Sequence, residues 1–419
     1  MFYIFILKMK INKKIIIFTN DFPTGNLEDT FIKFELSRLT RDFKEIEIIP
    51  QNNLKKKKKL EKNISTNLDF SKQFSKEKII KFFFFKTLFS CAFYKEIFEN
   101  LLKKNFIFKL KMIIIELTKS EIAYNWFLKN KIYQKKNLIF YSFWSDYLLL
   151  SFEKLKKKSN IKVISRVLGS DLNGFLKNDD YVPYIKKKFY SLDSVIVLTN
   201  YQKSILLKKK LIKANKIKIS PLGIYKTRKN TNTLKKNSIN FLSCNNLIEI
   251  KNTDKIINFI KIFSQLTSQK IHYYLIGTGK QFKEIKLELK SIEKYFDYKL
   301  IKKVENLPKF LLKNKIDFFL NFSSQEGMSF SIMEALGCGI PVICSKIKAN
   351  QNLVNKERGY FVNLNKLQSS YLKVSKLVLK DIKNKKNYFL KSDNAYNFVN
   401  KNLINEKCYK VFFNILNEI

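Results

Sequence analysis

Two glutamates separated by seven residues, Glu326 and Glu334, lie in the part of the sequence best suited to ligand chemistry. Glu326 belongs to a polar loop, residues 323–330, that follows an apolar run and precedes a helical pattern. A carboxylate in such a loop accepts hydrogen bonds from sugar hydroxyls, and the helix start offers N–H groups that attract phosphate. Gly327 permits a close turn, and Glu334, about one turn into the helix, is placed to reach ribose hydroxyls. A solvated surface turn is the alternative interpretation.

The residues after Glu334 extend this pattern. Residues 335–343 read Ala-Leu-Gly-Cys-Gly-Ile-Pro-Val-Ile, which ends a helix and opens a strand. The two glutamates followed by Gly-x-Gly-x-Pro-Val resemble the signature of family 4 retaining glycosyltransferases (glycosyl transferases group 1), which have the GT-B fold. The resemblance implies that Glu326 contacts the donor sugar as a catalytic residue, that Glu334 binds the ribose, and that loop amides bind the diphosphate. These amides belong to Gly327, Met328, Ser329 and Phe330.

Two further turns resemble donor-binding motifs of the same family. Residues 243–251 follow a predicted strand where the family places a basic pair for the diphosphate. Lys251 matches the lysine, whereas Asn246 stands where an arginine is common. Gly277 and Gly279 follow the next strand and resemble the family's Gly-x-Gly turn. Taken alone, each motif is also typical of a surface lysine or a tight strand-to-helix turn.

The first half carries matches to a subgroup of the family. Residues 20–31 follow the first predicted strand and resemble a donor-facing loop, in which Gly25 is the candidate for close approach to the donor phosphates. The family usually carries a histidine near the reacting sugar, but this chain has Leu168 in its place. Because leucine neither donates a hydrogen bond nor exchanges a proton, Asp171 or Arg166 is the catalytic candidate there; otherwise activity is reduced or altered.

Short apolar runs alternate with helical patterns in both halves, which indicates parallel sheets covered on both faces. The predicted strands are 14–18, 45–49, 138–142, 162–166 and 194–198, then 240–243, 272–276, 299–303, 317–321 and 341–344. The predicted helices are 30–39, 146–157, 184–192 and 202–210, then 254–266, 281–292, 307–314 and 330–336. We therefore predict an α/β protein of GT-B architecture, two Rossmann-like doubly wound domains facing across a cleft.

Composition suggests the domain limits. A Lys-, Asn- and Thr-rich stretch, residues 227–238, is typical of an interdomain linker. We expect an acceptor-binding domain over residues 1–225, a nucleotide-sugar-binding domain over 226–395, and a C-terminal helix over 396–419 that packs back on the first domain. Residues 54–136 contain a lysine run and Lys- and Phe-rich helical patterns, so we expect them to form a helical insertion in the first domain.

The charge balance is extreme, with 81 Lys plus Arg against 35 Asp plus Glu and a formal net charge of +46. Two explanations stay open: a surface for an anionic membrane or nucleic acid, or drift of the coding sequence toward A and T. The apolar stretch 79–98 is interrupted by Lys81, Lys86 and Lys95, so it predicts no transmembrane span. A membrane-surface helix there is an open hypothesis. We expect no nucleic acid as partner, because a protein that binds nucleic acid has no use for the paired glutamates.

Five scattered cysteines without a Cys-x-x-Cys pair predict a reducing, cytoplasmic compartment and no disulfide framework. Because the sequence has a single histidine, His272, it cannot form a His-rich metal site, and we expect this histidine to have a structural role. No Asp-x-Asp motif occurs in the sequence, which agrees with the metal-independent transfer that the resemblance implies. We therefore expect neither a cofactor nor a metal.

These observations predict a glycosyltransferase that moves a sugar, with retention, from a UDP- or GDP-sugar onto a saccharide or lipid-linked saccharide. A role in bacterial cell-surface polysaccharide synthesis, at the inner face of the membrane, is the expected setting. Transfer places negative charge on the leaving diphosphate, which preorganised N–H groups and Lys251 would stabilise. Two alternatives stay open: a degenerate GT-B protein that binds donor without turnover, and a basic protein that binds membranes or nucleic acid without catalysis.

Overall fold

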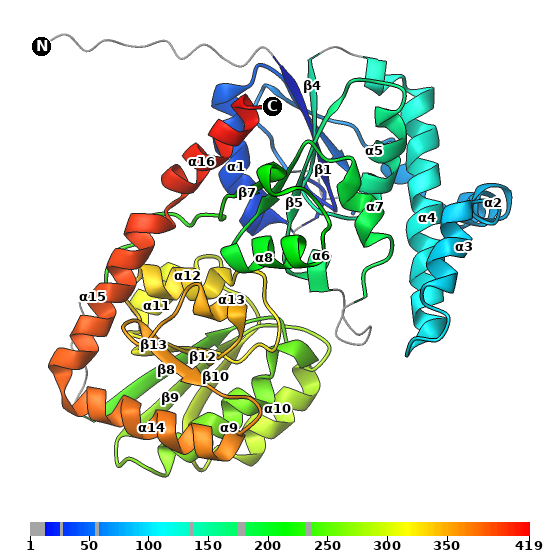
Figure 1. The fold of residues 1–419 in the computed structure, drawn as a ribbon. Helices are drawn as coiled ribbons and strands as arrows, with labels where there is room; N and C mark the ends of the chain where they lie inside the picture. Colours follow the sequence, from blue (N-terminus) through cyan, green and yellow to red (C-terminus); the bar gives the residue numbers. More distant parts are fainter. Residues whose placement is uncertain (1–12, 26–27, 55–57, 135–136, 174–180, 231–236) are drawn as a thin grey trace, which may run out of the picture. The chain divides into compact units, whose positions relative to one another are not determined.

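A computed structural model describes residues 13–25, 28–54, 58–134, 137–173, 181–230 and 237–419. The chain divides into two compact units, Met1–Leu222 with Tyr409–Ile419, and Gly223–Cys408. Each unit has a parallel sheet of its own with helices on both faces (Figure 1). Part of the predicted linker, residues 231–236, lies outside the described residues.

The sheet of the first unit has seven parallel strands in the described residues. In spatial order they are β3 (Ile64–Thr66), β2 (Ile46–Pro50), β1 (Lys14–Thr19), β4 (Leu138–Ser142), β5 (Lys162–Val167), β6 (Ser194–Val197) and β7 (Ile217–Ile219). The central strands are apolar on both faces because helices cover both, and their side chains form the core of the unit.

The helices of the first unit lie between and after these strands in the chain. They are α1 (Asp29–Asp42), α2 (Lys76–Phe82), α3 (Cys91–Phe98), α4 (Phe106–Lys129), α5 (Leu148–Lys156), α6 (Gly169–Asn173), α7 (Ile185–Tyr190), α8 (Asn200–Lys208) and most of α16 (Asn405–Asn417), with a π-helical turn η2 (Phe83–Thr87) between α2 and α3. Short 3₁₀ turns are η1 (Ser71–Gln73), η3 (Ile132–Gln134) and η5 (Ala214–Lys216). Within the segment predicted as a helical insertion, α2, η2, α3 and α4 occupy most of residues 76–129.

The sheet of the second unit has six parallel strands in the described residues. In spatial order they are β10 (Asp297–Ile301), β9 (Lys270–Ile276), β8 (Ser238–Cys244), β11 (Phe318–Asn321), β12 (Val342–Ser345) and β13 (Gly359–Val362). The helices are η6 (Glu249–Lys251), α9 (Thr253–Ser264), α10 (Phe282–Ser291), α11 (Leu307–Lys313), α12 (Phe330–Gly337), α13 (Lys348–Gln351), α14 (Leu367–Lys383) and α15 (Lys385–Asn402). Two apolar clusters, one on each face of the sheet, form its core.

The predicted fold class, two Rossmann-like doubly wound units, is confirmed. Every predicted strand is present, with small shifts at some ends. The edge strands β3, β7 and β13 were not predicted. The helix predicted over 396–419 is instead the end of α15 and a separate α16, because the helix breaks at Leu403. Among the described residues, no helix is both long and apolar enough to cross a membrane.

Candidate functional site

The strand order of the second unit creates a site at the carboxyl ends of β8 and β11. Strands β8, β9 and β10 extend the sheet in one direction, and β11, β12 and β13 extend it in the other. The loops after β8 and β11 therefore lead to opposite faces of the sheet, and in sheets of this kind ligands bind at such a switch point. The two loops that the sequence singled out, residues 243–251 and 323–330, are these loops.

Lys251 and Glu326 meet at this switch point, 75 residues apart in the chain. The Nζ atom of Lys251 donates to Oε1 of Glu326 at 2.6 Å, and both side chains are partly exposed. The hydroxyl of Ser323 donates to the same carboxylate oxygen at 2.7 Å, and the amide of Asn321 approaches it at 3.4 Å. Glu326 is thus held by residues of its own loop, and it in turn positions the lysine cation at the mouth of the site.

Hydrogen bonds tie the two loops to each other. Ser324 donates its backbone N–H to the carbonyl of Ile250 at 2.8 Å, and the amide of Asn252 donates to the carbonyl of Phe322 at 2.9 Å. Asn252 has φ of 48°, in the left-handed region that asparagine tolerates better than most residues. The site is therefore preorganised by hydrogen bonds between the two loops, one between backbone groups and one from the side chain of Asn252.

The first turn of α12 carries the predicted diphosphate-binding loop. Ser329 is its N-cap, with its hydroxyl 3.5 Å from the N–H of Ile332. The side chains of Met328 and Phe330 pack against the core of the unit, so the role predicted for them rests on their backbone amides. Gly327 is only partly exposed. The positive end of the helix dipole adds to the charge of Lys251 at this edge.

Glu334 lies one turn into α12 and is half-buried. Burial raises the pKa of its carboxyl from 4.5 to about 7. The same carboxylate raises the pKa values of Cys244 and Cys338, after the larger effect of their own burial, so it lies near the end of β8. Within the described part of the chain, no hydrogen bond or ion pair satisfies the side chain of Glu334. A half-buried acceptor of this kind fits a ligand hydroxyl.

Gly277 and Gly279 form the turn after β9, which packs on the loop after β8. A Cβ on Gly277 would lie 2.0 Å from the carbonyl oxygen of Asn245, and one on Gly279 would lie 2.3 Å from that of Leu247. Leu247 also donates its N–H to the carbonyl of Thr278 at 2.8 Å. The glycines are therefore required for close packing of two loops, and whether they also contact a donor stays a prediction.

In the first unit, the loop after β1 is organised by a buried carboxylate. Glu28 accepts the backbone N–H groups of Asn20, Asp21 and Phe22 at 2.7–3.1 Å and the indole N–H of Trp144. Burial raises the pKa of Glu28, although these donors act in the opposite direction. A Cβ at the predicted contact residue, Gly25, would lie 2.0 Å from the carboxylate of Asp21, so a larger residue there would have to displace the Asp21 side chain.

Asp171 is buried at the start of α6, where it fastens two loops. Its Oδ2 accepts the N–H of Leu168 at 2.7 Å and that of Ser145 at 3.3 Å. Burial raises the pKa of Asp171 to about 6, although these bonds lower it. The carboxyl lies at the carboxyl edge of β5, but its contacts describe a residue that positions the segment containing Leu168.

The structure argues against the catalytic role considered for Arg166. This side chain is 0% exposed. Its guanidinium forms an ion pair with Glu35, donates to the hydroxyl of Tyr141 at 2.9 Å and donates to the carbonyl of Ser220 at 2.8 Å. The ring of Phe412, from α16, covers it at 5.2 Å. Arg166 therefore acts inside the core of the first unit and does not reach a substrate. Sequence reasoning missed this because its partners are distant in the chain.

A polar pair that the sequence analysis did not single out lies at the same edge of the first sheet. Gln51, after β2, donates to the carboxylate of Asp146, after β4, at 2.6 Å. Burial raises the pKa of Asp146 to about 7. The available signal was that Gln51 follows the predicted strand 45–49 and that Asp146 begins the predicted helix 146–157, which comes after the strand 138–142.

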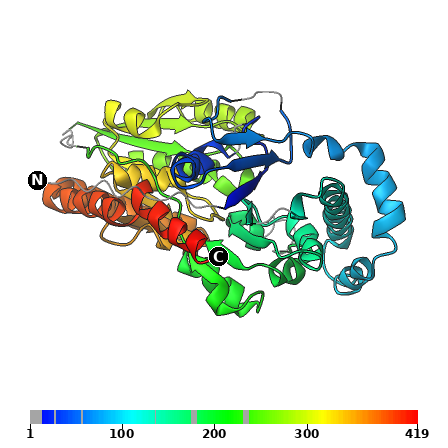
Figure 2. The ribbon, with the colours of Figure 1, turned by 90° about the horizontal axis from the view of Figure 1, so that it is seen from above.

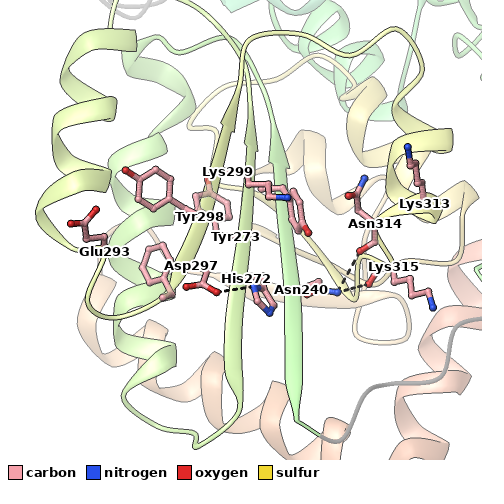
Figure 3. Close-up of a pocket in the computed structure, with 12 residues that line it drawn as sticks. Asn240, His272, Tyr273, Glu293, Asp297, Tyr298, Lys299, Lys313, Asn314 and Lys315 are labelled. Carbon is pink, nitrogen blue, oxygen red and sulfur yellow. Dashed lines mark hydrogen bonds and ion pairs between the residues drawn. The ribbon is translucent and has the colours of Figure 1, made fainter.

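A groove of about 880 Å³ at the amino ends of β8, β9 and β10 lies at the opposite edge of the second sheet (Figure 3). It contains His272, whose Nδ1 lies 3.3 Å from Asp297. The amide of Asn240 donates to the carbonyl of Lys315 at 3.0 Å, which closes one side. None of the predicted site residues lines this groove, so it is not the predicted donor site.

Comparison with protein families agrees with the geometry of the second unit. Residues 225–391 match the profile of the family described as glycosyl transferases group 1. The matched residues all lie within the second unit. Membership of family 4 within that group stays a prediction. Comparison with curated protein sequences gave no match.

Three solved structures illustrate the fold shared by the whole chain. Anabaena HepE in complex with UDP and glucose is 12% identical, with a TM-score of 0.65 over 97% of this chain and 100% of that one. The lipopolysaccharide outer core galactosyltransferase WaaB, in its apo form, is 13% identical, with a TM-score of 0.64 over 97% and 100%. A point mutant of S. aureus TarM, in complex with fondaparinux, α-GlcNAc-glycerol and UDP, is 16% identical, with a TM-score of 0.57. That match covers 71% of this chain and 59% of the TarM chain. These similarities establish the GT-B fold of the chain.

Proposed function

We propose that this chain transfers a sugar from a nucleotide-sugar donor, bound by its second unit, to a saccharide or lipid-linked saccharide held by its first unit. The observation that carries the proposal is the Lys251–Glu326 pair, held at the switch point of a group 1 domain. The likeness to HepE and TarM, solved with UDP, and to WaaB, described as a galactosyltransferase, supports a nucleotide-sugar donor. A UDP-sugar is the first donor to test and a GDP-sugar the second.

The chemistry of the site suits departure of a diphosphate. Breaking the bond between the anomeric carbon and phosphate leaves positive charge on the sugar and negative charge on the leaving group. Lys251 and the first-turn amides of α12 are fixed before the reaction, so they stabilise that charge without reorganisation. Glu326 would bind the sugar hydroxyls, and the unpaired carboxylate of Glu334 would accept the ribose hydroxyls.

Retention and metal independence belong to this proposal. They are supported by the resemblance around Glu326 and Glu334 and by a site in which a lysine and helix amides supply the positive charge. Two measurements check them: the anomeric configuration of the product by NMR, and transfer rates with and without EDTA. An inverted product, or activity that requires a divalent cation, would exclude these two features.

Thermal stability against UDP-, GDP- and ADP-sugars tests donor binding directly. A ligand of the folded state raises the melting temperature once its concentration exceeds the dissociation constant. We expect a rise with one nucleotide class, lost in Glu334→Ala and kept in Glu293→Ala, a matched change in the groove at the opposite edge. No shift with any donor would contradict the proposal. Binding without turnover would favour the degenerate transferase, in which Leu168 replaces a needed histidine.

A further inference from the structure

The helices of residues 76–115 have apolar side chains on an internal face and further apolar side chains that are exposed. One face is internal: Phe83, Leu88, Phe93 and Ile97 pack against the first half of α4 in a small core of their own. Both views place α2 and α3 on the side of α4 that faces away from the sheet (Figures 1 and 2). The carboxylate of Glu96 fixes them to the unit, because it accepts the hydroxyl of Tyr181 at 2.6 Å.

Many other apolar side chains of this segment are exposed. Eleven of the twenty-one exposed large hydrophobic side chains in the described part of the chain lie between residues 80 and 115. Four of them, Phe85, Phe89, Phe98 and Leu102, are 69%, 82%, 74% and 98% exposed. The others are Ile80, Phe84, Tyr94, Leu101, Ile107, Phe108 and Ile115. Such concentration on less than a tenth of the chain marks an interaction site, whereas scattered exposed hydrophobics need no explanation.

The same segment is rich in exposed basic residues. The exposed lysines of the segment are Lys76, Lys78, Lys81, Lys86, Lys95, Lys103, Lys104 and Lys111. Only two glutamates, Glu77 and Glu99, are exposed in the same 40 residues. We call these exposed apolar and basic side chains of residues 76–115, taken together, the outer helical surface. Its combination of aromatic and aliphatic side chains with lysines is typical of helices that lie in a membrane interface.

We propose that the outer helical surface docks on a lipid bilayer that contains anionic lipids. The phenylalanines and leucines would enter the boundary between headgroups and acyl chains, and the lysines would contact the acidic headgroups. A second copy of the chain is a poorer occupant, because its own lysines would repel the lysines of this surface. Nucleic acid is poorer too, because the exposed leucines and isoleucines find no apolar partner on a phosphate backbone. The proposal does not depend on sugar transfer.

Vesicle sedimentation with the full-length protein tests this docking. We compare phosphatidylcholine vesicles with vesicles that contain about 30% phosphatidylglycerol, at low and high salt, and expect at least about tenfold stronger partition onto the anionic vesicles. High salt should weaken binding, because it screens the lysines. Equal partition onto both kinds of vesicle, or onto neither, would overturn the proposal.

Matched variants separate the two contributions. One variant carries serine at Phe85, Phe89, Phe98 and Leu102, and a second carries glutamine at Lys81, Lys86, Lys95 and Lys104. Each variant should bind the anionic vesicles about tenfold less strongly or weaker still than the unmodified protein. These side chains are exposed, so circular dichroism should show intact folding. The controls are serine at Leu54, Tyr190, Leu287 and Leu390, and glutamine at Lys373, Lys376, Lys385 and Lys386, which are exposed elsewhere.

Three outcomes would refute docking through this surface. The first is unchanged partition of both outer-surface variants. The second is an equal loss in the control variants, which would indicate binding by net charge alone. The third is a concentration-dependent dimer, found by analytical ultracentrifugation and abolished by the serine variant, with no lipid binding. The last result would assign the surface to a second copy of the chain.

Discussion

Glu334 combines an acidic group, partial burial and no partner among the described residues. Because its pKa is raised by burial from 4.5 to about 7, ionisation costs more in the folded state than in the unfolded state. The protonated carboxyl of Glu334 therefore contributes fully to the free energy of unfolding below pH 4.5, and this contribution is lost as the pH rises through 7. A carboxylate that weakens the fold at neutral pH is typical of a ligand-binding group, since the ligand supplies the missing hydrogen bonds.

Replacement of Glu334 by glutamine should remove this loss. We expect Glu334→Gln to match the unmodified protein at about pH 4.5 and to exceed its free energy of unfolding at about pH 8 by up to about 3 kcal/mol. Denaturant unfolding at the two pH values measures the difference. If the difference in free energy of unfolding between the variant and the unmodified protein is the same at both pH values, the carboxyl titrates normally.

Lys251 is the side chain that we propose to pair with the diphosphate of the donor. Lys251→Gln should lower the affinity for the nucleoside diphosphate about tenfold or more, because a hydrogen bond to a charged group contributes roughly 1.5–3 kcal/mol. The fold should survive, since Glu326 keeps Ser323 as a donor at 2.7 Å. Isothermal titration with the nucleoside mono- and diphosphates gives the comparison. Lys270→Gln, at the amino end of β9, is the control, and equal affinities in both variants would remove Lys251 from the site.

At the scale of elements, α16 completes the core of the first unit from the far end of the sequence. Phe412 lies 5.4 Å from the ring of Tyr141 and covers the guanidinium of Arg166. The hydroxyl of Tyr409 donates to Asp42 at 2.9 Å. Phe412 is 1% exposed, so its ring closes the buried ion pair of Arg166 from water.

Truncation of this ring should be costly for the first unit. Phe412→Ala should reduce the free energy of unfolding by about 3–5 kcal/mol, because it leaves a cavity over a buried charge. Tryptophan fluorescence reads this directly, since Trp126 and Trp144 both lie in the first unit. Val411→Ala is the matched control, because Val411 is exposed. A loss below about 1 kcal/mol would mean that α16 contributes little to that core.

The sequence predicted the central strands because each is a continuous apolar run between helices, as in residues 14–19 and 138–142. The edge strands β3 and β7 have only three residues each, too few for a period-two pattern to distinguish them from turns. Glu326 and Lys251 were predicted from motifs, whereas their ion pair follows from adjacency of β8 and β11. The burial of Arg166 depends on Glu35, 131 residues away, and no local pattern shows it.

At the scale of the molecule, two units with separate cores should respond separately to ligand. The predicted donor groups, Lys251, Glu326 and Glu334, belong to the second unit, whereas both tryptophans belong to the first. Tryptophan fluorescence therefore follows unfolding of the first unit, and far-ultraviolet circular dichroism follows both. Comparing the unfolding transitions seen by the two signals therefore shows which unit binds the donor.

The bound nucleotide should stabilise only the unit that holds it. With donor at about 100 times its dissociation constant, we expect about 2.7 kcal/mol of added stability in the second unit. The transition seen by circular dichroism should then move to higher denaturant while the tryptophan transition stays in place. Glu334→Ala should abolish the difference. If both signals shift together, the units unfold as one cooperative body, and if only tryptophan shifts, the donor binds the first unit.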